Sequence, residues 1–287
     1  MTSSMSMYGG KDLVIPDDFT DPGLPSRGVF SASQHGMYHR CPRQYFYRYI
    51  LGEKQKPGIA MTRGKAVHKG AEVTHQSTID TGMPLKKEEA LEAVANEFDR
   101  DVDNIELEKD DNPGHIKDQT IRNFSVYYDQ AVPIVRPVEV ERGFAIKFGT
   151  VPVIGFIDLV DEVLVERVEE TDVPGEGPLV IEVVSDLKLT GKKWAAQKLR
   201  HEPQLTFYAH VVGTPNVRID FLLDLKSGTR YVQERSLRNP NDVRLLVEDV
   251  EESVDNIKKG RFPRCDPTTW VCNDRFCGFY EKCRGPK

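Results

Sequence analysis

Hydrophobic and polar residues follow different periods in the two halves of this 287-residue chain. In the first half, apolar residues recur with a patchy 3.6-residue spacing, which predicts helices over about residues 61–79, 86–105 and 113–131. Upstream, SASQHGMYHRC offers serines as N-caps for a short helix, and PRQYFYRYIL predicts a second helix that begins at Pro42. The first half is therefore expected to be mostly helical.

From Val138 onward, apolar and polar residues alternate in segments rich in Val and Ile, which is typical of strands. Five such segments follow one another: VEVERGFAIKF, VPVIGFIDLVDEVLV, PLVIEVVSDLKL, VRIDFLLDL and RYVQERSL. A helix over about residues 192–213 separates the third from the fourth, and a last helix spans about 240–258. This order predicts an α/β fold with a mixed central sheet flanked by helices.

The domain organisation follows from the same pattern. Residues 1–28 show neither period and are rich in Gly, Pro and Ser, so we expect an irregular N-terminal arm. Residues 29–287 are expected to form a single domain. It would consist of a helical part (29–137), a sheet core (138–236) and a C-terminal helix with a cysteine segment (237–287).

Composition indicates an ordinary globular protein, with 39% hydrophobic and 29% charged residues. No apolar run approaches the roughly 20 residues of a membrane-spanning helix, and the first residues lack the pattern of an export signal. We therefore expect a cytoplasmic protein without a membrane partner. Five cysteines, an odd number, then favour free thiols that bind a metal over a disulfide framework.

The net charge of −6 is unlike that of a typical nucleic-acid-binding protein, but one basic strip stands out. Its members are Lys192, Lys193, Trp194, Lys198 and Arg200. Cationic side chains around a tryptophan suit a single nucleic-acid strand, through phosphate charge and base stacking. A solvated helix face explains the strip equally well.

Acidic residues occur within two of the predicted strands. Asp186 and Lys188 are two positions apart, so both side chains leave the same face of their strand. Asp158 closes the apolar run VIGFID, where a buried carboxylate costs free energy unless a cation compensates it. Two carboxylates that bind hard cations, with a lysine that orients water or stabilises developing charge, are the groups that phosphodiester hydrolysis needs. A surface ion pair is the alternative.

Three residues on predicted helices complete the candidate site. His68, in TRGKAVHKG, would add an imidazole ligand for magnesium or manganese, although a packed surface histidine is the commoner situation. Gln204 and Tyr208 lie at positions i and i+4 in PQLTFYAH and so share one helix face. Core packing is the alternative for Tyr208.

In this order, the histidine, GFIDLVD, SDLKL and QLTFY resemble the motifs of the PD-(D/E)XK nuclease superfamily, in its RecB-type exonuclease branch. The leading SASQHGMYHRCPRQYFYRYILG resembles the same branch. The resemblance implies a restriction-endonuclease-like core and a metal-dependent exonuclease that acts on DNA ends or single strands. It implies the following roles: His68, Asp158, Asp186 and the carbonyl of Leu187 bind Mg²⁺ or Mn²⁺, Lys188 activates water, and Gln204 and Tyr208 position the DNA strand or the lysine.

The cysteines resemble those of a subset of this branch, the CRISPR-associated and AddB-type nucleases. That subset binds a 4Fe-4S cluster through one cysteine before the nuclease core and three after it, a pattern that Cys41, Cys272, Cys277 and Cys283 match. The match departs in one spacing, since four residues separate Cys272 from Cys277 where relatives commonly have two. Cys265 could also replace a ligand, and zinc is the rival metal.

Compact, stand-alone members of this branch are typical of bacteriophage recombination genes and CRISPR loci. The resemblance therefore implies DNA as a partner, with a recombination or CRISPR adaptation protein as a further one. No Walker-type phosphate-binding motif occurs, so any helicase function would belong to another chain. Two alternatives remain open: a DNA-end-binding or partner-binding module of a larger recombination complex, and a zinc-stabilised nuclease-like protein.

Overall fold

A computed structural model describes most of the chain. The described residues are 3–7, 11–16, 18–102, 105, 111–165 and 179–286. Their contacts divide the chain into two compact units. Unit 1 comprises Met1–Gln55, Gly143–Phe156 and Asn239–Lys287, and unit 2 comprises Lys56–Arg142 and Ile157–Arg238.

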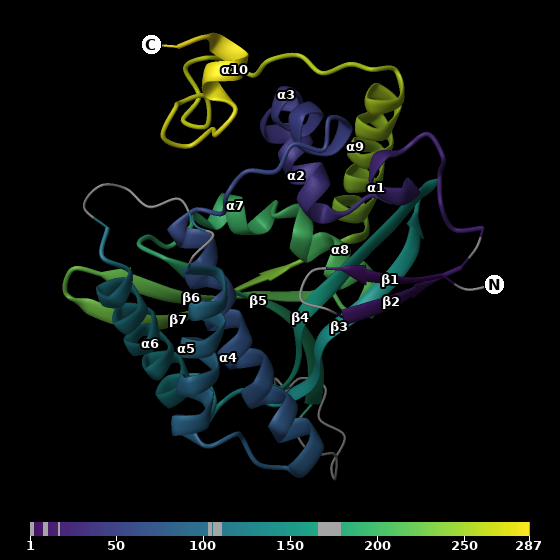
Figure 1. The fold of residues 1–287 in the computed structure, drawn as a ribbon. Coiled ribbons are helices and arrows are strands. Elements are labelled where there is room, and N and C mark those ends of the chain that lie inside the picture. The colour runs from purple at the N-terminus through teal and green to yellow at the C-terminus, as the bar shows by residue number, and fades with distance from the viewer. Residues whose placement is uncertain are drawn as a thin grey trace. The chain divides into compact units, whose positions relative to one another are not determined.

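A five-stranded sheet forms the centre of the fold (Figure 1). Its strands are β3 (Pro137–Phe148), β4 (Val151–Val165), β5 (Leu179–Thr190), β6 (Asn216–Leu225) and β7 (Gly228–Leu237), paired in that order. β4 and β5 run antiparallel, as do β6 and β7, whereas β5 and β6 run parallel. A parallel pair needs a crossover, and the helices between β5 and β6 supply it. The predicted α/β class with a mixed sheet flanked by helices is confirmed.

Three long helices of unit 2 pack against one another beside the sheet (Figure 1). They are α4 (Ile59–Thr81), α5 (Lys87–Val102) and α6 (Pro113–Gln130), close to the predicted ranges. The α6 helix begins at Asn112, whose side chain accepts a hydrogen bond from the His115 amide. Gly70 of α4 permits close packing, because a Cβ there would lie 2.4 Å from a methyl group of Val94.

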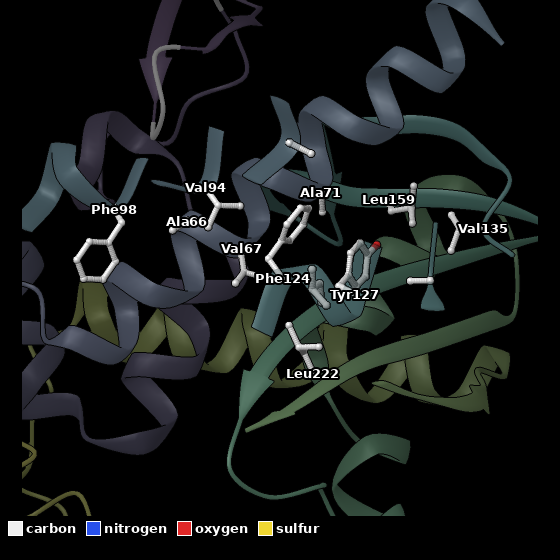
Figure 2. Close-up of a cluster of buried hydrophobic side chains, with 13 residues drawn as sticks. Ala66, Val67, Ala71, Val94, Phe98, Phe124, Tyr127, Val135, Leu159 and Leu222 are labelled. Atoms are coloured by element: carbon white, nitrogen blue, oxygen red, sulfur yellow. The ribbon is translucent and has the colours of Figure 1, made fainter. Parts of the chain in front are cut away.

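The main core of unit 2 lies between these helices and the sheet, as Figure 2 shows for its buried side chains. Phe98 of α5 and Phe124 and Tyr127 of α6 are its largest side chains. Leu159, Leu187 and Leu222 join from β4, β5 and β6. Side chains alternate along a strand, so the neighbours Asp158, Asp186 and Lys188 leave the opposite face of the sheet.

The crossover contains two helices, α7 (Ala196–Arg200) and α8 (Pro203–Val212), where the sequence predicts one over 192–213. The difference has a simple cause. Pro203 has no amide hydrogen and cannot continue a preceding helix, so it takes the first turn of a new one.

Unit 1 contains α2 (Ala32–Arg40), α3 (Pro42–Tyr45), the π-helix η1 (Phe46–Ile50), α9 (Pro240–Lys258) and α10 (Tyr280–Arg284). Ser31 caps α2 as predicted, because its hydroxyl accepts a hydrogen bond from the Gln34 amide. Cys41 ends α2 and precedes Pro42 at the start of α3. Within the described residues, no helix has both the length and the apolar character needed to cross a bilayer.

The N-terminal region corrects one expectation. Where the sequence predicts an irregular arm over residues 1–28, β1 (Ser3–Met7) pairs antiparallel with β2 (Lys11–Ile15), and a short helix α1 (Pro25–Gly28) follows. Leu13 and Ile15 are two positions apart and both are buried, in a cluster with Phe19, Val29 and Ile154. So short an alternating run gives little signal in the sequence, and burial against distant residues makes it a strand.

Candidate functional site

Two carboxylates on adjacent strands form the centre of the candidate site in unit 2. The antiparallel register pairs Leu159 with Ser185, and Asp158 and Asp186 occupy the next position on each strand. The side chain of Asp186 is fully buried, and that of Asp158 is 19% exposed. The structure thus brings together the two carboxylates that the sequence places in separate strands.

His68 of α4 lies beside this pair. Its Nδ1 is 3.6 Å from Oδ2 of Asp158, and its Nε2 is 2.7 Å from the carbonyl oxygen of Leu187. The Leu187 carbonyl oxygen can only accept, so Nε2–H of His68 donates this hydrogen bond. The lone pair of a neutral imidazole is then on Nδ1, the nitrogen that lies nearer Asp158.

Glu141 of β3 is a fourth acidic or imidazole side chain at this site, and the sequence did not indicate it. Ligand atoms of His68, Glu141 and Asp158 all lie within 4.8 Å of one another. The backbone of Glu141 has a φ of +48°, which costs a non-glycine residue on the order of 1–3 kcal/mol. In the sequence, nothing distinguishes Glu141 from Glu139. Only the structure does so, because Glu141 has a left-handed backbone conformation and lies near His68 and Asp158.

The pKa values of Asp158, Asp186 and Lys188 are shifted in different directions. Burial, followed by the Asp186 carboxylate, raises the pKa of Asp158 well above its ordinary value. Burial alone would raise the pKa of Asp186, but the Lys188 ammonium 2.6 Å away, a hydrogen bond with Asp158 and the nearby His68 together lower that pKa. Burial opposes the Lys188 ammonium, yet Asp186 and Asp158 together raise the pKa of Lys188. Asp186 and Lys188 are therefore a charged pair, and Asp158 retains a proton most readily.

Burial also lowers the pKa of His68, despite the attraction of Asp186 for its charged form. A neutral imidazole has a lone pair that can bind a metal. The histidine is thus in the protonation state that a ligand needs.

The oxygen atoms of the site fit a divalent cation. When both aspartates are ionised, neither can donate a hydrogen bond to the other. Asp158 Oδ2 and Asp186 Oδ1 are then buried without a hydrogen-bond partner among the described residues. A proton shared between them relieves this cost. A hard cation with oxygen ligands would relieve it in the same way.

Gln204 and Tyr208 lie together on α8. The Gln204 amide donates a 2.7 Å hydrogen bond to the Tyr208 hydroxyl, as the i, i+4 spacing led us to expect. Burial, followed by the carboxylates of Asp158 and Asp186, raises the pKa of Tyr208 well above its ordinary value. The tyrosine therefore remains a neutral phenol near the two aspartates.

A buried network that the sequence did not reveal supports the strands on the other face of the sheet. The Arg218 guanidinium is 1% exposed and pairs with Asp161 at 2.5 Å and Asp220 at 2.9 Å. The Tyr231 hydroxyl donates to Asp220, and Asp161 accepts from the Arg136 amide. These bonds tie β4, β6 and β7 to one another and so help to fix the strand that carries Asp158.

The predicted basic strip is largely exposed. Lys193 pairs with Glu234 at 2.6 Å, and the Lys198 ammonium lies 3.7 Å from the ring centre of Trp194. Trp194 is half-buried against Phe221, whereas Lys192 and Arg200 are exposed. The strip is thus an accessible cationic surface with one anchored aromatic ring.

All five cysteines line one cavity in unit 1. Cys41 comes from the junction of α2 and α3, Cys283 from α10, and Cys265, Cys272 and Cys277 from the turns between α9 and α10. Tyr47 and Phe279 pack beside them with ring centres 5.1 Å apart. Residues more than two hundred positions apart thus share one site.

Cys41 and Cys265 differ in how readily they become thiolates. Burial opposes ionisation of Cys41, but backbone amides at the start of α3 and from Cys265 outweigh it and lower the pKa of Cys41. Burial raises the pKa of Cys265 to about 11.

The cysteine sulfurs are more widely spread than the oxygen and nitrogen atoms of the carboxylate site. In the part of the chain that the structure describes, no three of them lie within 4.8 Å of one another. Four thiolates around one zinc ion would be about 3.8 Å apart, given a Zn–S bond of about 2.3 Å. The cavity has suitable donors for a metal group, but they are not gathered around a single point.

Residues 29–284 match the model of the PD-(D/E)XK nuclease superfamily. The chain belongs to this superfamily, so the predicted superfamily and the predicted class of hydrolytic nuclease are confirmed. Its RecB-type iron-sulfur branch remains a prediction.

Two solved structures are similar to the chain at low identity. One is a presumed exonuclease from Eubacterium rectale, with a TM-score of 0.49, 12% identity, and coverage of 85% of this chain and 86% of that one. The other is SSO0001, with a TM-score of 0.34, 13% identity, and coverage of 82% of this chain and 89% of that one. No curated protein sequence matches the chain significantly.

Proposed function

We propose that the protein is a metal-dependent deoxyribonuclease that hydrolyses phosphodiester bonds at DNA ends or in single strands, as an exonuclease. One observation carries the proposal. In a member of a nuclease superfamily, two adjacent buried carboxyl groups lie beside an imidazole and a paired lysine ammonium. Ionising both carboxyl groups is costly, and a divalent cation would compensate the second negative charge in place of a proton.

In this proposal His68, Asp158, Asp186 and the Leu187 carbonyl hold Mg²⁺ or Mn²⁺, and Glu141 adds a further carboxylate. The bound cation would polarise the phosphate and lower the pKa of a water molecule. The protein itself positions the side chains that would bind the cation. The sheet register fixes the aspartates, and α4 holds the imidazole against β5.

Lys188 orients the attacking water and stabilises the negative charge that develops on the phosphate. Its raised pKa favours this role, since an ammonium donates hydrogen bonds and attracts charge but cannot accept a proton. Gln204 and Tyr208 position the DNA strand or the lysine through their shared hydrogen bond. The basic strip with Trp194 binds the strand by phosphate charge and base stacking.

We further propose that Cys41, Cys272, Cys277 and Cys283 hold a structural 4Fe-4S cluster. Four cysteines around one cavity are the donor set that such clusters use. A metal group bound by residues from both ends of the chain would stabilise unit 1 by removing freedom from the unfolded chain.

The setting in this proposal is DNA recombination, repair or CRISPR-type processing in the cytoplasm of a bacterial or phage-infected cell. A recombination or CRISPR adaptation protein would be the partner. These expectations rest on the resemblance of the motifs to the RecB-type branch.

Digestion of DNA labelled at the 5′ or the 3′ end tests the activity. We expect the wild-type protein to digest single- or double-stranded DNA only when Mn²⁺ or Mg²⁺ is added. Asp186→Ala or Lys188→Ala should slow digestion by at least about a thousandfold, because each removes a group that fixes or stabilises charge in the transition state. Both variants should retain the brown iron-sulfur absorbance.

Asp129→Ala is the matched control, because Asp129 is an exposed carboxylate on α6 that pairs with Lys87 at the surface. It should digest DNA at the wild-type rate. Digestion that persists in Asp186→Ala would refute the assignment of the site. A wild-type protein that binds DNA ends with Mn²⁺ present but never cleaves them would instead be a binding module.

A further inference from the structure

Two aromatic side chains project from the cysteine segment of unit 1. Trp270 is 69% exposed and Phe276 is 58% exposed, and they are the two aromatic residues among the strongly exposed large hydrophobic side chains of the described chain. Their ring centres are 5.7 Å apart, with the rings edge to face at 78°. Large exposed apolar groups that lie together mark a binding surface more often than single ones do.

The neighbours of these rings hold them outward. Val271 follows Trp270 and is buried, and Cys277 follows Phe276 and is also buried. Backbone hydrogen bonds from Cys272 to Thr269 and from Cys277 to Asn273 fix the turns between them. The local chain therefore buries one residue of each pair and leaves the aromatic ring exposed.

The surroundings of the pair are cationic in an acidic protein. The Arg275 guanidinium lies 5.9 Å from the ring centre of Phe276. Between residues 261 and 287, Lys and Arg outnumber Asp and Glu by six to three, while the whole chain carries a net charge of −6. Paired aromatic rings on a positive segment match the charge and the planar bases of a nucleic acid.

We propose that Trp270 and Phe276 form a stacking platform for the bases of single-stranded DNA, with phosphate charge balanced by the basic residues around them. The inference rests on the proposed function for its substrate class, and it adds a second contact region outside the basic strip of unit 2. Single strands are favoured over duplex because their unpaired bases can expose a face to a ring. An acidic protein would share the charge but not the planar bases.

Tryptophan fluorescence provides a direct test. The chain has two tryptophans, so Trp194→Phe leaves Trp270 as the sole reporter. Without added divalent cation, a deoxythymidine oligonucleotide should quench the fluorescence of this variant, because a stacked base contacts the indole. An abasic oligonucleotide of equal length should bind through its phosphates and quench little.

Affinity measured by fluorescence anisotropy of labelled single strands gives a second readout. Trp270→Ala should weaken binding about tenfold, the lower part of the range for one stacked base, and Trp270→Phe should recover most of the loss. Met83→Ala is the control, since Met83 is 68% exposed but is an aliphatic side chain in unit 2. It should bind like the wild type.

Equal quenching by both oligonucleotides, or unchanged affinity in Trp270→Ala, would overturn the platform. The latter result would assign the aromatic pair to another partner, such as a protein. If such a variant still digests DNA with Mn²⁺, only the platform fails. A wild-type protein that neither binds nor digests DNA would remove the proposed function as well.

Discussion

The carboxylate site of unit 2 and the cysteine cavity of unit 1 differ in what holds their side chains. Asp158 and Asp186 lie on neighbouring strands whose register fixes both, and His68 lies on a helix of 23 residues. Four of the five cysteines lie in turns or in the five-residue helix α10. Regular backbone hydrogen bonds therefore organise the first site, whereas the second has few of them.

This difference bears on how far each site is organised before a metal binds. The two aspartates are already side by side on paired strands, so a cation would enter a prepared position. The cysteine cavity has a small apolar cluster around Tyr47 and Phe279 and many turns. A metal group bound there, as proposed, would therefore contribute more to local stability than a cation at the carboxylate site.

The largest expected effect concerns the cysteine cavity. Cys277→Ser should remove the iron-sulfur absorbance and lower the free energy of unfolding of unit 1 by about 4 kcal/mol, because it removes a ligand of the metal group. Binding of Mn²⁺ at the carboxylate site should remain. Anaerobic purification, absorbance spectra and chemical denaturation measure these changes.

Cys265→Ser is the control for this assignment. Cys265 is outside the four proposed ligands, so we expect the absorbance to persist and the free energy of unfolding to change by less than about 0.5 kcal/mol. If Cys265→Ser loses the absorbance and Cys277→Ser keeps it, Cys265 is the ligand in place of Cys277. Zinc in place of iron in the purified protein would exclude the cluster.

A smaller effect is expected at the carboxylate site. Glu141→Gln removes one negative charge without changing side-chain size, and we expect it to weaken Mn²⁺ binding by about 10- to 100-fold. Titration calorimetry measures the affinity independently of cleavage. Glu139→Gln is the matched control on the same strand, because Glu139 pairs with Arg142 at 2.8 Å, outside the group around His68. Equal affinities in the two variants would show that Glu141 is no ligand.

The last prediction concerns how the free energy of unfolding of unit 1 depends on pH. Burial, followed by the neighbouring His39, lowers the pKa of His35 to about 3, whereas an unfolded histidine has a pKa of about 6.5. The unfolded chain therefore binds this proton more tightly than the folded chain. The contribution of neutral His35 to the free energy of unfolding is therefore complete above pH 6.5. It falls by about 1.4 kcal/mol per pH unit as the pH decreases toward 3.

Denaturation curves between pH 6.5 and 4.5 check this dependence. His35→Gln should reduce the slope of unfolding free energy against pH by about 1.4 kcal/mol per unit. His115→Gln, at an exposed position near the start of α6, should leave the slope unchanged. A wild-type slope in His35→Gln would mean that other groups cause the pH dependence.

Much of the fold could be predicted from periodicity. The five strands and the long helices α4, α5, α6 and α9 lie close to their predicted ranges, because buried faces impose a period of 2 or 3.6 on the sequence. Two predictions needed correction. The hairpin β1–β2 has little intrinsic pattern, and the helix over 192–213 divides at Pro203.

The candidate site was predictable only in part. The order of the motifs pointed to His68, Asp158, Asp186 and Lys188, which the structure brings together. Glu141 and Arg218 gave no such signal. A glutamate or an arginine in an alternating strand looks like any solvated charge until its surroundings are known.

The sequence by itself determined which segments become strands and helices, which chemical groups are present, and that the chain is a nuclease of this superfamily. Those properties depend on neighbours along the chain and on the order of motifs. Only the tertiary structure decided which aspartate keeps a proton more readily, that Glu141 joins the site, and that Cys41 shares one cavity with the four cysteines of residues 265–283. Burial and the distances between charges set these properties, and both arise when segments far apart in sequence pack together.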